Sequence, residues 1–253
     1  MSDAELEGRV VWVTGASRGL GRHVALALAD AGAKLLLTAR SSDQLEQLAQ
    51  EIRTHGGVVE VVAGSVADAD VIERSAALIG ERFGHLDILI NNAGISPAFV
   101  TSERLAKSAW QDVLDVNLSA PLACCQHALP LLENAGGGSI VNITSIHGSR
   151  AHERLIAYAA SKGGLEMVTR TLALEWATRA IHVNAIAPGY LETDMTAGLR
   201  EHERWRETLL TRIPMHRFGT TSEVVPAVLF LAGPGASYIT GTTLYIDGGW
   251  TAA

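Results

Sequence analysis

The sequence predicts an α/β fold in which short parallel strands alternate with helices around one sheet. Short apolar runs recur along the 253 residues, and longer amphipathic stretches separate them. The runs are rich in Leu and β-branched residues, as expected of strands buried on both faces. Such alternation indicates βαβ units with helices on both faces of a parallel sheet. The expected strands are Val10–Val13, Lys34–Thr38, Val58–Ala63, Leu86–Ile90, Ser139–Ile143, His182–Ile186 and Thr243–Ile246.

The stretches between these strands have the apolar spacing of helices. The expected helices are Gly21–Ala31, Ser42–His55, Asp68–Phe83, Ala106–Leu132, Tyr158–Thr178 and Ser222–Leu231. The last has a start signal, because Thr221-Ser222-Glu223 offers a cap and an early acid. No linker or repeat divides the chain, so we expect one domain over residues 1–253. A charged segment after a Pro-Gly turn predicts a substrate lid at about 190–217; the alternative is a solvated surface helix.

Composition limits the class of function. The chain is 47% apolar and 19% charged with a net charge of −7, and it has no basic stripe, so nucleic acid is not an expected partner. No signal peptide and no apolar run of about 18 residues is found, so we expect no membrane segment. The adjacent Cys124 and Cys125 lack metal-ligand spacing, and we expect them to be buried thiols in a cytoplasmic protein.

A glycine-rich turn follows the first expected strand and opens the first expected helix. It reads Thr14-Gly15-Ala16-Ser17-Arg18-Gly19-Leu20-Gly21. Glycines allow a tight turn and a close approach of backbone N–H groups to a pyrophosphate, which the dipole of a helix N-terminus also favours. A glycine triplet alone is weak evidence, but its place between strand and helix strengthens it. The turn therefore predicts a dinucleotide site.

The end of the second expected strand indicates which dinucleotide is bound. A free ribose 2′-hydroxyl favours an acidic residue there. This strand ends in Leu37-Thr38-Ala39-Arg40 instead, and Arg18 adds a second guanidinium in the glycine-rich turn. Two arginines suit a 2′-phosphate, which accepts charge-assisted hydrogen bonds. We therefore favour NADP(H) over NAD(H); the alternative is that both arginines are merely solvated.

Tyr158 and Lys162 are four residues apart in an expected helix and share one face. A tyrosine hydroxyl has an ordinary pKa of about 10, which is too high for proton transfer at neutral pH. A nearby ammonium favours phenolate and lowers that pKa. Ser145 follows the fifth expected strand, at the carboxyl edge where open α/β sheets bind ligands. These three residues predict an acid–base site, although a Tyr-x-x-x-Lys pair is common by itself.

Together these motifs resemble those of the classical short-chain dehydrogenase/reductase family, in order and spacing, over essentially the whole chain. The motifs are Thr14-Gly15-x-x-x-Gly19-x-Gly21, Asn91-Asn92-Ala93-Gly94, Asn117, Ser145, Tyr158-x-x-x-Lys162 and Pro188-Gly189. The resemblance implies a Rossmann-type, doubly wound, seven-stranded parallel sheet in a single domain. It also implies an oxidoreductase that acts on CH–OH groups with NAD(P) as acceptor.

The resemblance implies a catalytic tetrad of Asn117, Ser145, Tyr158 and Lys162. By analogy, Tyr158 protonates the carbonyl oxygen in reduction or deprotonates the alcohol in oxidation, and Ser145 orients that oxygen. Lys162 binds the nicotinamide ribose and lowers the pKa of Tyr158, while Asn117 supports a water between Lys162 and solvent. The residues alone leave a structural interpretation of Asn117 open, since a buried Asn needs hydrogen-bond partners.

The cofactor positions are also carried over by resemblance. They are Gly15, Ser17, Arg18, Gly19, Leu20, Gly21, Arg40, Ser65, Val66, Asn92, Ala93, Gly94, Tyr158, Lys162, Pro188, Gly189, Leu191 and Thr193. One position departs from the family pattern. An Asp near the end of the third strand usually accepts a hydrogen bond from the adenine amino group, and here Ser65 stands in its place. A hydroxyl also accepts hydrogen bonds, so Ser65 remains a cofactor residue.

Two histidines lie between Ser145 and Tyr158, where the family's chain borders the substrate. His147 and His152 have no acidic or cysteine partner at metal-ligand spacing, so we expect no metal site. Ser96 and Tyr190 complete the expected substrate residues, and a surface position is the alternative for either histidine.

The leading hypothesis is an NADP(H)-dependent oxidoreductase that interconverts a ketone or aldehyde and a secondary alcohol, with Tyr158 as general acid and base. The pattern resembles 3-oxoacyl-(carrier protein) reductases and keto-sugar or gluconate 5-dehydrogenase-like enzymes equally, so the small-molecule substrate stays open. A non-catalytic dinucleotide sensor is a remote alternative, because it would be expected to lack a tetrad member. Family members are commonly tetramers or dimers, so we expect a homo-oligomer.

Overall fold

A parallel sheet of seven strands runs through the computed structural model, which describes residues 6–96 and 99–253. The strand order is β3-β2-β1-β4-β5-β6-β7. The strands are β1 Val10–Thr14, β2 Lys34–Ala39, β3 Val58–Ala63, β4 Ile88–Asn91, β5 Gly138–Ile143, β6 Ile181–Pro188 and β7 Thr243–Ile246. Because β1 lies between β2 and β4, the winding of the chain reverses there, so the predicted doubly wound parallel sheet is confirmed.

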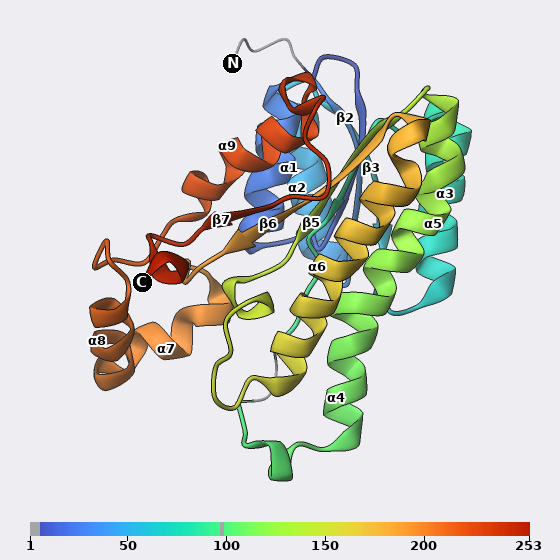
Figure 1. Cartoon of the computed structure of the whole chain (residues 1–253). Helices are drawn as coiled ribbons and strands as arrows, with labels where there is room; N and C mark the ends of the chain where they lie inside the picture. The colour runs from blue at the N-terminus through green and yellow to red at the C-terminus, as the bar shows by residue number, and fades with distance from the viewer. Residues whose placement is uncertain (1–5, 97–98) are drawn as a thin grey trace.

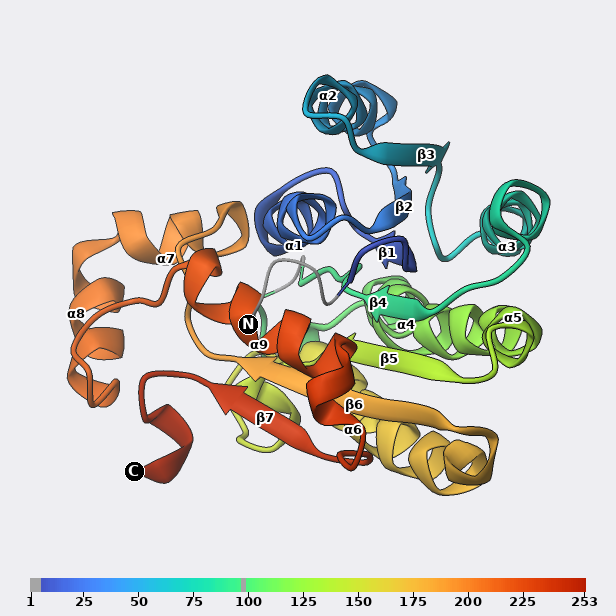
Figure 2. The same cartoon turned by 90° about the horizontal axis from the view of Figure 1, so that it is seen from above.

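Helices cover both faces of the sheet (Figures 1 and 2). They are α1 Gly19–Asp30, α2 Ser42–Thr54, α3 Ala69–Phe83, α4 Lys107–Leu114, α5 Ala120–Asn134, α6 Ile156–Trp176, α7 Ala197–Glu201, α8 Glu203–Arg212 and α9 Thr221–Ala232. Seen from above, α1, α2 and α9 lie on one side of the sheet, and α3, α5 and α6 lie on the other. The short α7 and α8 stand away from the sheet (Figure 1).

Each face of the sheet has its own hydrophobic core. Along β1 the side chains alternate, so that Val11 and Val13 pack toward α1 and α9, while Val10 and Trp12 pack toward α3 and α5. All four are at most 1% exposed. Burial on both faces explains why the strands read as continuous apolar runs rather than as alternating patterns.

Two predicted elements differ in detail from the structure. The expected helix Ala106–Leu132 is interrupted by a π-helical turn, Asp115–Ser119, that joins α4 to α5. The cap of α9 is Thr220 rather than Thr221, in a capping box with Glu223. Apolar spacing alone does not reveal one extra residue in a turn, and two adjacent threonines offer the same capping chemistry.

The strand register brings the carboxyl ends of four strands to one edge of the sheet. Val13 pairs with Ile90, Asn91 with Asn142, and Ile143 with Ile186. The turns that follow β1, β4, β5 and β6 therefore open on the same side, where the strand order reverses. Ligands of open α/β sheets bind in such a crevice. Among the described residues, no helix is long and apolar enough to cross a membrane.

Candidate active site

A cavity of about 740 Å³ lies at this edge of the sheet. Every cofactor and substrate residue expected from the sequence lines it, from Gly15 to Thr193, together with Ser145, Tyr158 and Lys162. The structure thus brings these residues into one site. Among the described residues, Asn117 is the one predicted site residue that does not line the cavity. The cavity has a cofactor half near the glycine-rich turn and a substrate half between Ser145 and α8.

Glycine is required at two positions where the glycine-rich turn closes on its neighbours. A Cβ atom on Gly21 would lie 2.3 Å from the Gly15 carbonyl oxygen and 2.4 Å from Asn92 Nδ2. Gly15 itself has a φ of 66°, in the left-handed region that favours glycine. Asn92 Nδ2 donates to the carbonyl oxygens of Thr14 and Gly15, each at 3.0 Å. Asn92 therefore ties the turn to the end of β4, a role that its family motif does not show.

The N-terminus of α1 is built to receive an anion. Its N-cap is Arg18, whose side chain makes no capping hydrogen bond, and no acidic residue lies in the first turn. The first backbone N–H groups of a helix lack intrahelical partners, and the helix dipole adds partial positive charge there. A pyrophosphate at this position would satisfy those donors. The geometry therefore fits the predicted dinucleotide.

Two basic side chains stand at the same end of the cavity. Arg18 and Arg40 both line it and are exposed. Arg18 Nη1 lies 3.6 Å from Asp194 Oδ2, which joins the glycine-rich turn to the segment after β6. Ser41 and Gln44, at the start of α2, also line this end and were not predicted. The sequence feature that could have indicated Ser41 and Gln44 is their position directly after Arg40, at the start of a helix.

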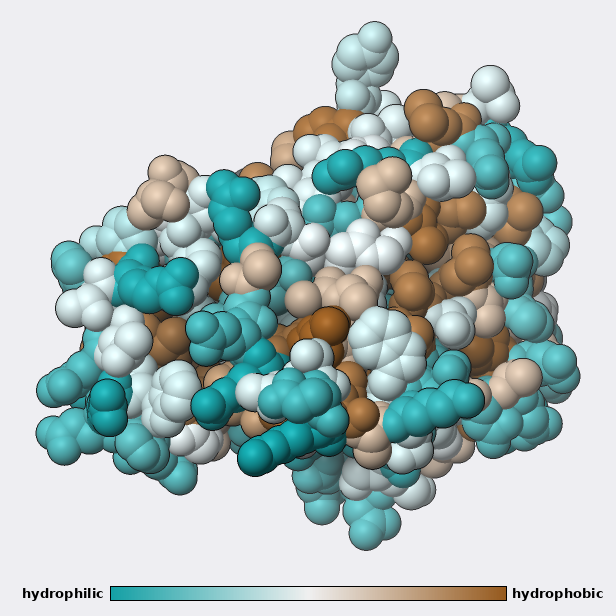
Figure 3. Space-filling view, turned by 60° about the horizontal axis from the view of Figure 1, so that its bottom comes forward, coloured by the Kyte–Doolittle hydropathy of each residue, from teal (hydrophilic) through white to brown (hydrophobic). Residues whose placement is uncertain are grey.

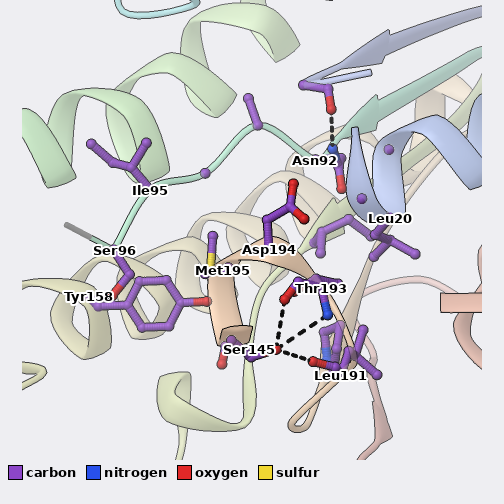
Figure 4. Close-up of a pocket in the computed structure, with 18 of the residues that line it drawn as sticks. Leu20, Asn92, Ile95, Ser96, Ser145, Tyr158, Leu191, Thr193, Asp194 and Met195 are labelled. Carbon is purple, nitrogen blue, oxygen red and sulfur yellow. Dashed lines mark hydrogen bonds between the residues drawn. The ribbon is translucent and has the colours of Figure 1, made fainter. Parts of the chain in front are cut away.

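Ser145 and Tyr158 meet at the centre of the cavity (Figure 4). The Tyr158 hydroxyl points into the pocket, and Ser145 lies below it in that view. Ser145 follows β5 and caps the short helix Ile146–Gly148, where its Oγ accepts a hydrogen bond from the His147 N–H at 3.2 Å. Burial raises the pKa of Tyr158, and its hydrogen bond with Ser145 partly opposes this rise.

Lys162 lies one turn further along α6 and is 3% exposed. Its Nζ donates to the Ile143 carbonyl oxygen at 2.7 Å and lies 5.8 Å from the centre of the Tyr158 ring. Burial lowers the pKa of Lys162 to about 8. The pKa of Tyr158 is thus raised by burial, whereas the sequence led us to expect that Lys162 lowers it. The reason is that both groups are desolvated and the ammonium is held at a carbonyl rather than at the phenol.

Asn117 is fully buried in the π-helical turn, beside the cavity rather than in its wall. Its Oδ1 accepts from the Ile95 N–H at 2.8 Å, and its Nδ2 donates to the Ile95 carbonyl at 2.9 Å and to Ser161 Oγ at 3.1 Å. These bonds fasten the loop after β4 to α6. These hydrogen bonds agree with a structural role of Asn117, the interpretation that the sequence leaves open.

The substrate half of the cavity is walled by aromatic and aliphatic side chains. Phe99 packs edge-on against Trp205 of α8, with ring centres 5.6 Å apart, and lies 6.0 Å from the ring of His152. Ile95, Leu155, Leu199 and Leu209 complete this apolar wall. The sequence had not indicated Phe99 or Trp205, because neither lies in a motif. All four predicted substrate residues are present here, namely Ser96, His147, His152 and Tyr190.

The predicted lid segment, about 190–217, contains a turn at Asp194–Thr196 followed by α7 and α8. Met195, Leu199, Trp205 and Leu209 from this segment line the cavity. In Figure 3 its side of the molecule, at the left, carries mostly hydrophilic side chains on the outside. The segment therefore has an apolar inner face toward the cavity and a hydrated outer face. Its motion stays a prediction.

Comparison with known proteins identifies the family. The family model described as enoyl-(acyl carrier protein) reductase matches residues 15–251. A 3-oxoacyl-[acyl-carrier-protein] reductase FabG of Staphylococcus aureus is 38% identical over 238 residues, which cover 94% of this chain and 96% of that protein. This chain belongs to the short-chain dehydrogenase/reductase family.

Solved structures support the same assignment for this dehydrogenase/reductase. A Burkholderia cenocepacia gluconate 5-dehydrogenase, crystallised with NADP and tartrate, has a TM-score of 0.94 and 32% identity over 98% of this chain and 97% of that chain. A Beutenbergia cavernae protein assigned as an NAD(P)-dependent gluconate 5-dehydrogenase, with bound NADP at low occupancy, has a TM-score of 0.94 and 37% identity over the full length of both chains. The Rossmann-type fold and an NAD(P)-dependent oxidoreductase acting on CH–OH or carbonyl groups are therefore confirmed.

Proposed function

We propose that this short-chain dehydrogenase/reductase is an NADP(H)-dependent enzyme that interconverts a ketone or aldehyde and a secondary alcohol. One observation carries the proposal: Ser145, Tyr158 and Lys162 converge at the junction between the cofactor half and the substrate half of one cavity. A carbonyl placed there would meet the Tyr158 hydroxyl and the Ser145 hydroxyl together. When bound, NADP(H) supplies or accepts the hydride.

The proposed roles follow from the position of each side chain. Tyr158 donates a proton to the carbonyl oxygen in reduction and takes it back from the alcohol in oxidation. Ser145 orients that oxygen by a hydrogen bond. Lys162, held at the Ile143 carbonyl, lies 5.8 Å from the centre of the Tyr158 ring, and the hydrogen bond with Ser145 opposes the rise in pKa that burial imposes on Tyr158. Asn117 keeps the loop after β4 in place beside this group.

NADP(H) is proposed over NAD(H) because Arg18 and Arg40 line the cofactor half and β2 ends without an acidic residue; Asp194, which pairs with Arg18, comes from the segment after β6. The residues fit the group, since α1 begins without a cap and Arg18, Arg40 and Ser41 line the cavity beside it. The NADP-containing relatives favour the same choice. A 2′-phosphate would accept charge-assisted hydrogen bonds from both guanidinium groups.

A screen that follows NADPH absorbance with ketones, keto-sugars and acetoacetyl-CoA tests the reaction. The same screen with NADH tests the cofactor choice, and a tenfold preference for NADH would contradict the roles of Arg18 and Arg40. Acetoacetyl-CoA serves as the probe for a 3-oxoacyl-carrier-protein reductase. The similarity to the Staphylococcus aureus relative favours this activity. Gluconate oxidation with NADP⁺ tests the activity of the Burkholderia relative.

The Tyr158→Phe variant is expected to lose activity by a factor of about 10³, because general acid–base catalysis contributes about 10² to 10⁴. Its affinity for NADPH, measured by fluorescence titration, should stay within about twofold. Tyr238→Phe is the matched control, since Tyr238 is fully exposed and outside the cavity. Full activity of Tyr158→Phe would refute the proposed proton transfer and favour another donor.

A homo-oligomer is also proposed. Met167 and Leu174, one above the other on α6, are 56% and 83% exposed. Figure 3 shows apolar side chains gathered on the right, where Figure 1 places α5 and α6. Such a face supports packing against a second copy across a symmetry axis. Size-exclusion chromatography with light scattering measures the state, and a monomer at micromolar concentration would reject it.

A further inference from the structure

We propose that His147 and Tyr190 form a specificity-determining pair that accepts a hydrogen bond from a hydroxyl or N–H group of an uncharged, largely apolar substrate. The inference rests on the proposed function, because it concerns the substrate half of the same cavity. It adds what that function leaves open, namely the chemical class of the molecule that carries the reacting carbonyl.

The direction of the hydrogen bonds follows from the partner of His147. Its Nδ1 lies 3.2 Å from the Arg150 carbonyl oxygen, and its Nε2 lies 3.2 Å from the Tyr190 hydroxyl. A carbonyl oxygen only accepts, so Nδ1 carries the proton. In a neutral imidazole Nε2 is then an acceptor, and it takes the proton of the Tyr190 O–H. Burial lowers the pKa of His147 to about 4, which agrees with a neutral ring.

The Tyr190 oxygen is left with lone pairs and no proton to offer. Tyr190 lines the cavity, and burial raises its pKa to about 12, so the hydroxyl keeps its proton for His147. Its ring is held edge-on by Trp250 at 5.0 Å and by Phe218 at 6.4 Å between ring centres. A substrate group that meets this oxygen must therefore donate. The pair presents a fixed acceptor.

This acceptor lies close to the reacting centre. The His147 ring is 6.5 Å from the Tyr158 ring and 5.7 Å from the Tyr190 ring between centres, and the His147 N–H donates to Ser145. The His147 side chain thus contacts the Tyr190 hydroxyl and packs against the Tyr158 ring, so we infer that a carbonyl at Ser145 and Tyr158 has the Tyr190 oxygen as a near neighbour. The expected donor is on the carbon next to the carbonyl or one further away.

The surrounding wall argues against a charged substrate. Among the described lining residues, the Arg, Lys, Asp and Glu side chains are Arg18, Arg40 and Asp194 at the cofactor half and Lys162 at the centre. Arg154 and Arg212 stack on the rings of Phe99 and Trp250 and do not line the cavity. A carboxylate in the substrate half would be desolvated with no lining cation as a direct partner, because Arg212, whose charge acts on His147 and Tyr190, stacks on the Trp250 ring. Phe99, Trp205 and Leu209 favour an apolar or aromatic body instead.

Three matched ketones test the inference: 1-phenylpropan-2-one, its 3-hydroxy derivative and the 3-methoxy ether of that derivative. The ether has nearly the same inductive effect as the alcohol but cannot donate. We expect kcat/KM with NADPH to be at least about tenfold higher for the hydroxy ketone than for either other probe, because a missing hydrogen bond to a buried acceptor costs at least this factor. Phenylpyruvate, which carries a carboxylate, should be the poorest substrate of the set.

Two variants make the test specific. Tyr190→Phe should abolish the preference for the hydroxyl, and Tyr238→Phe should retain it. His147→Leu frees the Tyr190 O–H to donate, so the ether should approach or overtake the hydroxy ketone. A merely structural role of His147 would lower kcat/KM for all three probes alike.

The outcomes separate this inference from the proposed function. If the enzyme oxidises NADPH with all three ketones but treats the alcohol and the ether alike, the acceptor pair is refuted and the reaction stands. If none is reduced, calorimetric binding of the three probes to the protein with NADP⁺ still reports the preference. Equal affinities there would refute the pair, and a faster turnover of phenylpyruvate would refute the uncharged substrate.

Discussion

The two halves of the cavity are built in different ways. The cofactor half is made largely of backbone, namely glycines, a helix end without a side-chain cap and strand ends tied together by Asn92, with Arg18 and Arg40 at its far end. The substrate half is made of side chains from the loop after β4, the turn after β5 and the segment between β6 and α9. A site formed by backbone atoms keeps the same binding groups when most side chains change. A site formed by side chains changes its binding properties with single substitutions. The comparison suggests that the first half defines the reaction and the second defines the substrate.

Two glycine substitutions, one in the cofactor half and one on α7 beside the substrate half, are the strongest way to test this comparison. Gly21→Ala forces a Cβ atom against the Gly15 carbonyl oxygen and Asn92, so the turn must shift. We expect NADPH affinity to fall by about 100-fold or more, as misplacements of about 1 Å do, and stability to fall by about 1–3 kcal/mol. Titration of NADPH fluorescence and urea unfolding measure the two effects.

Gly198→Ala is the control on α7, next to Leu199 of the substrate half. Gly198 lies in α7, and a Cβ atom there would meet no atom within 4 Å. Alanine is a better helix former by about 1 kcal/mol, so stability should stay equal or rise slightly. Equal losses of cofactor affinity in the two variants would contradict the division of the cavity into two halves.

The next prediction concerns Lys162, which lies on the border of the two halves. Its pKa is about 8 in the folded protein against an ordinary 10.5. Between pH 8 and pH 10.5 the unfolded chain binds more protons at Lys162 than the folded protein does, so the free energy of unfolding rises with pH. The stability contribution of this group is complete above pH 10.5 and is lost as the pH falls through 8. The difference between the two pKa values corresponds to about 3 kcal/mol.

Lys162→Met removes this titration. Its free energy of unfolding minus that of the natural protein should fall by up to about 3 kcal/mol between pH 7 and pH 10.5. Other titrating groups are common to both proteins and cancel in the difference. Urea unfolding at several pH values provides the curve. A difference that is independent of pH would show that Lys162 is solvated and would place it outside the buried centre.

The smallest expected effect concerns the 2′ end of the cofactor half. Arg40→Gln should lower kcat/KM for NADPH by about tenfold, the value of one charge-assisted hydrogen bond, and leave that for NADH within about twofold. Arg74→Gln, which breaks the exposed pair with Asp70 on α3, is the matched control. If both cofactors lose equally, Arg40 supports the fold of this edge rather than the choice of dinucleotide.

The sequence predicted the cofactor half much better than the substrate half. Strand ends and glycine turns are continuous in the chain, so Gly15, Gly21 and Asn92 are readable as motifs. Phe99 and Trp205 lie far apart in sequence and meet only when α8 packs against the loop after β4. No local pattern marks such a contact. The raised pKa of Tyr158 was likewise unpredictable, because it depends on burial that residue spacing does not specify.

The π-helical turn at Asn117 has a consequence for the rod formed by α4 and α5. A π turn holds about one residue more than an α turn, so everything after it is rotated by about 100° relative to an unbroken helix. The buried stripe of α5, which includes Cys124, Ala128 and Leu132, is therefore out of phase with the helix that Val113 belongs to. Deleting one residue between 115 and 119 would restore a regular helix and turn that stripe away from the sheet. The additional residue rotates the buried face of α5 relative to that of α4. The continuous helix can therefore pack α5 against the core while it places Asn117 beside the site.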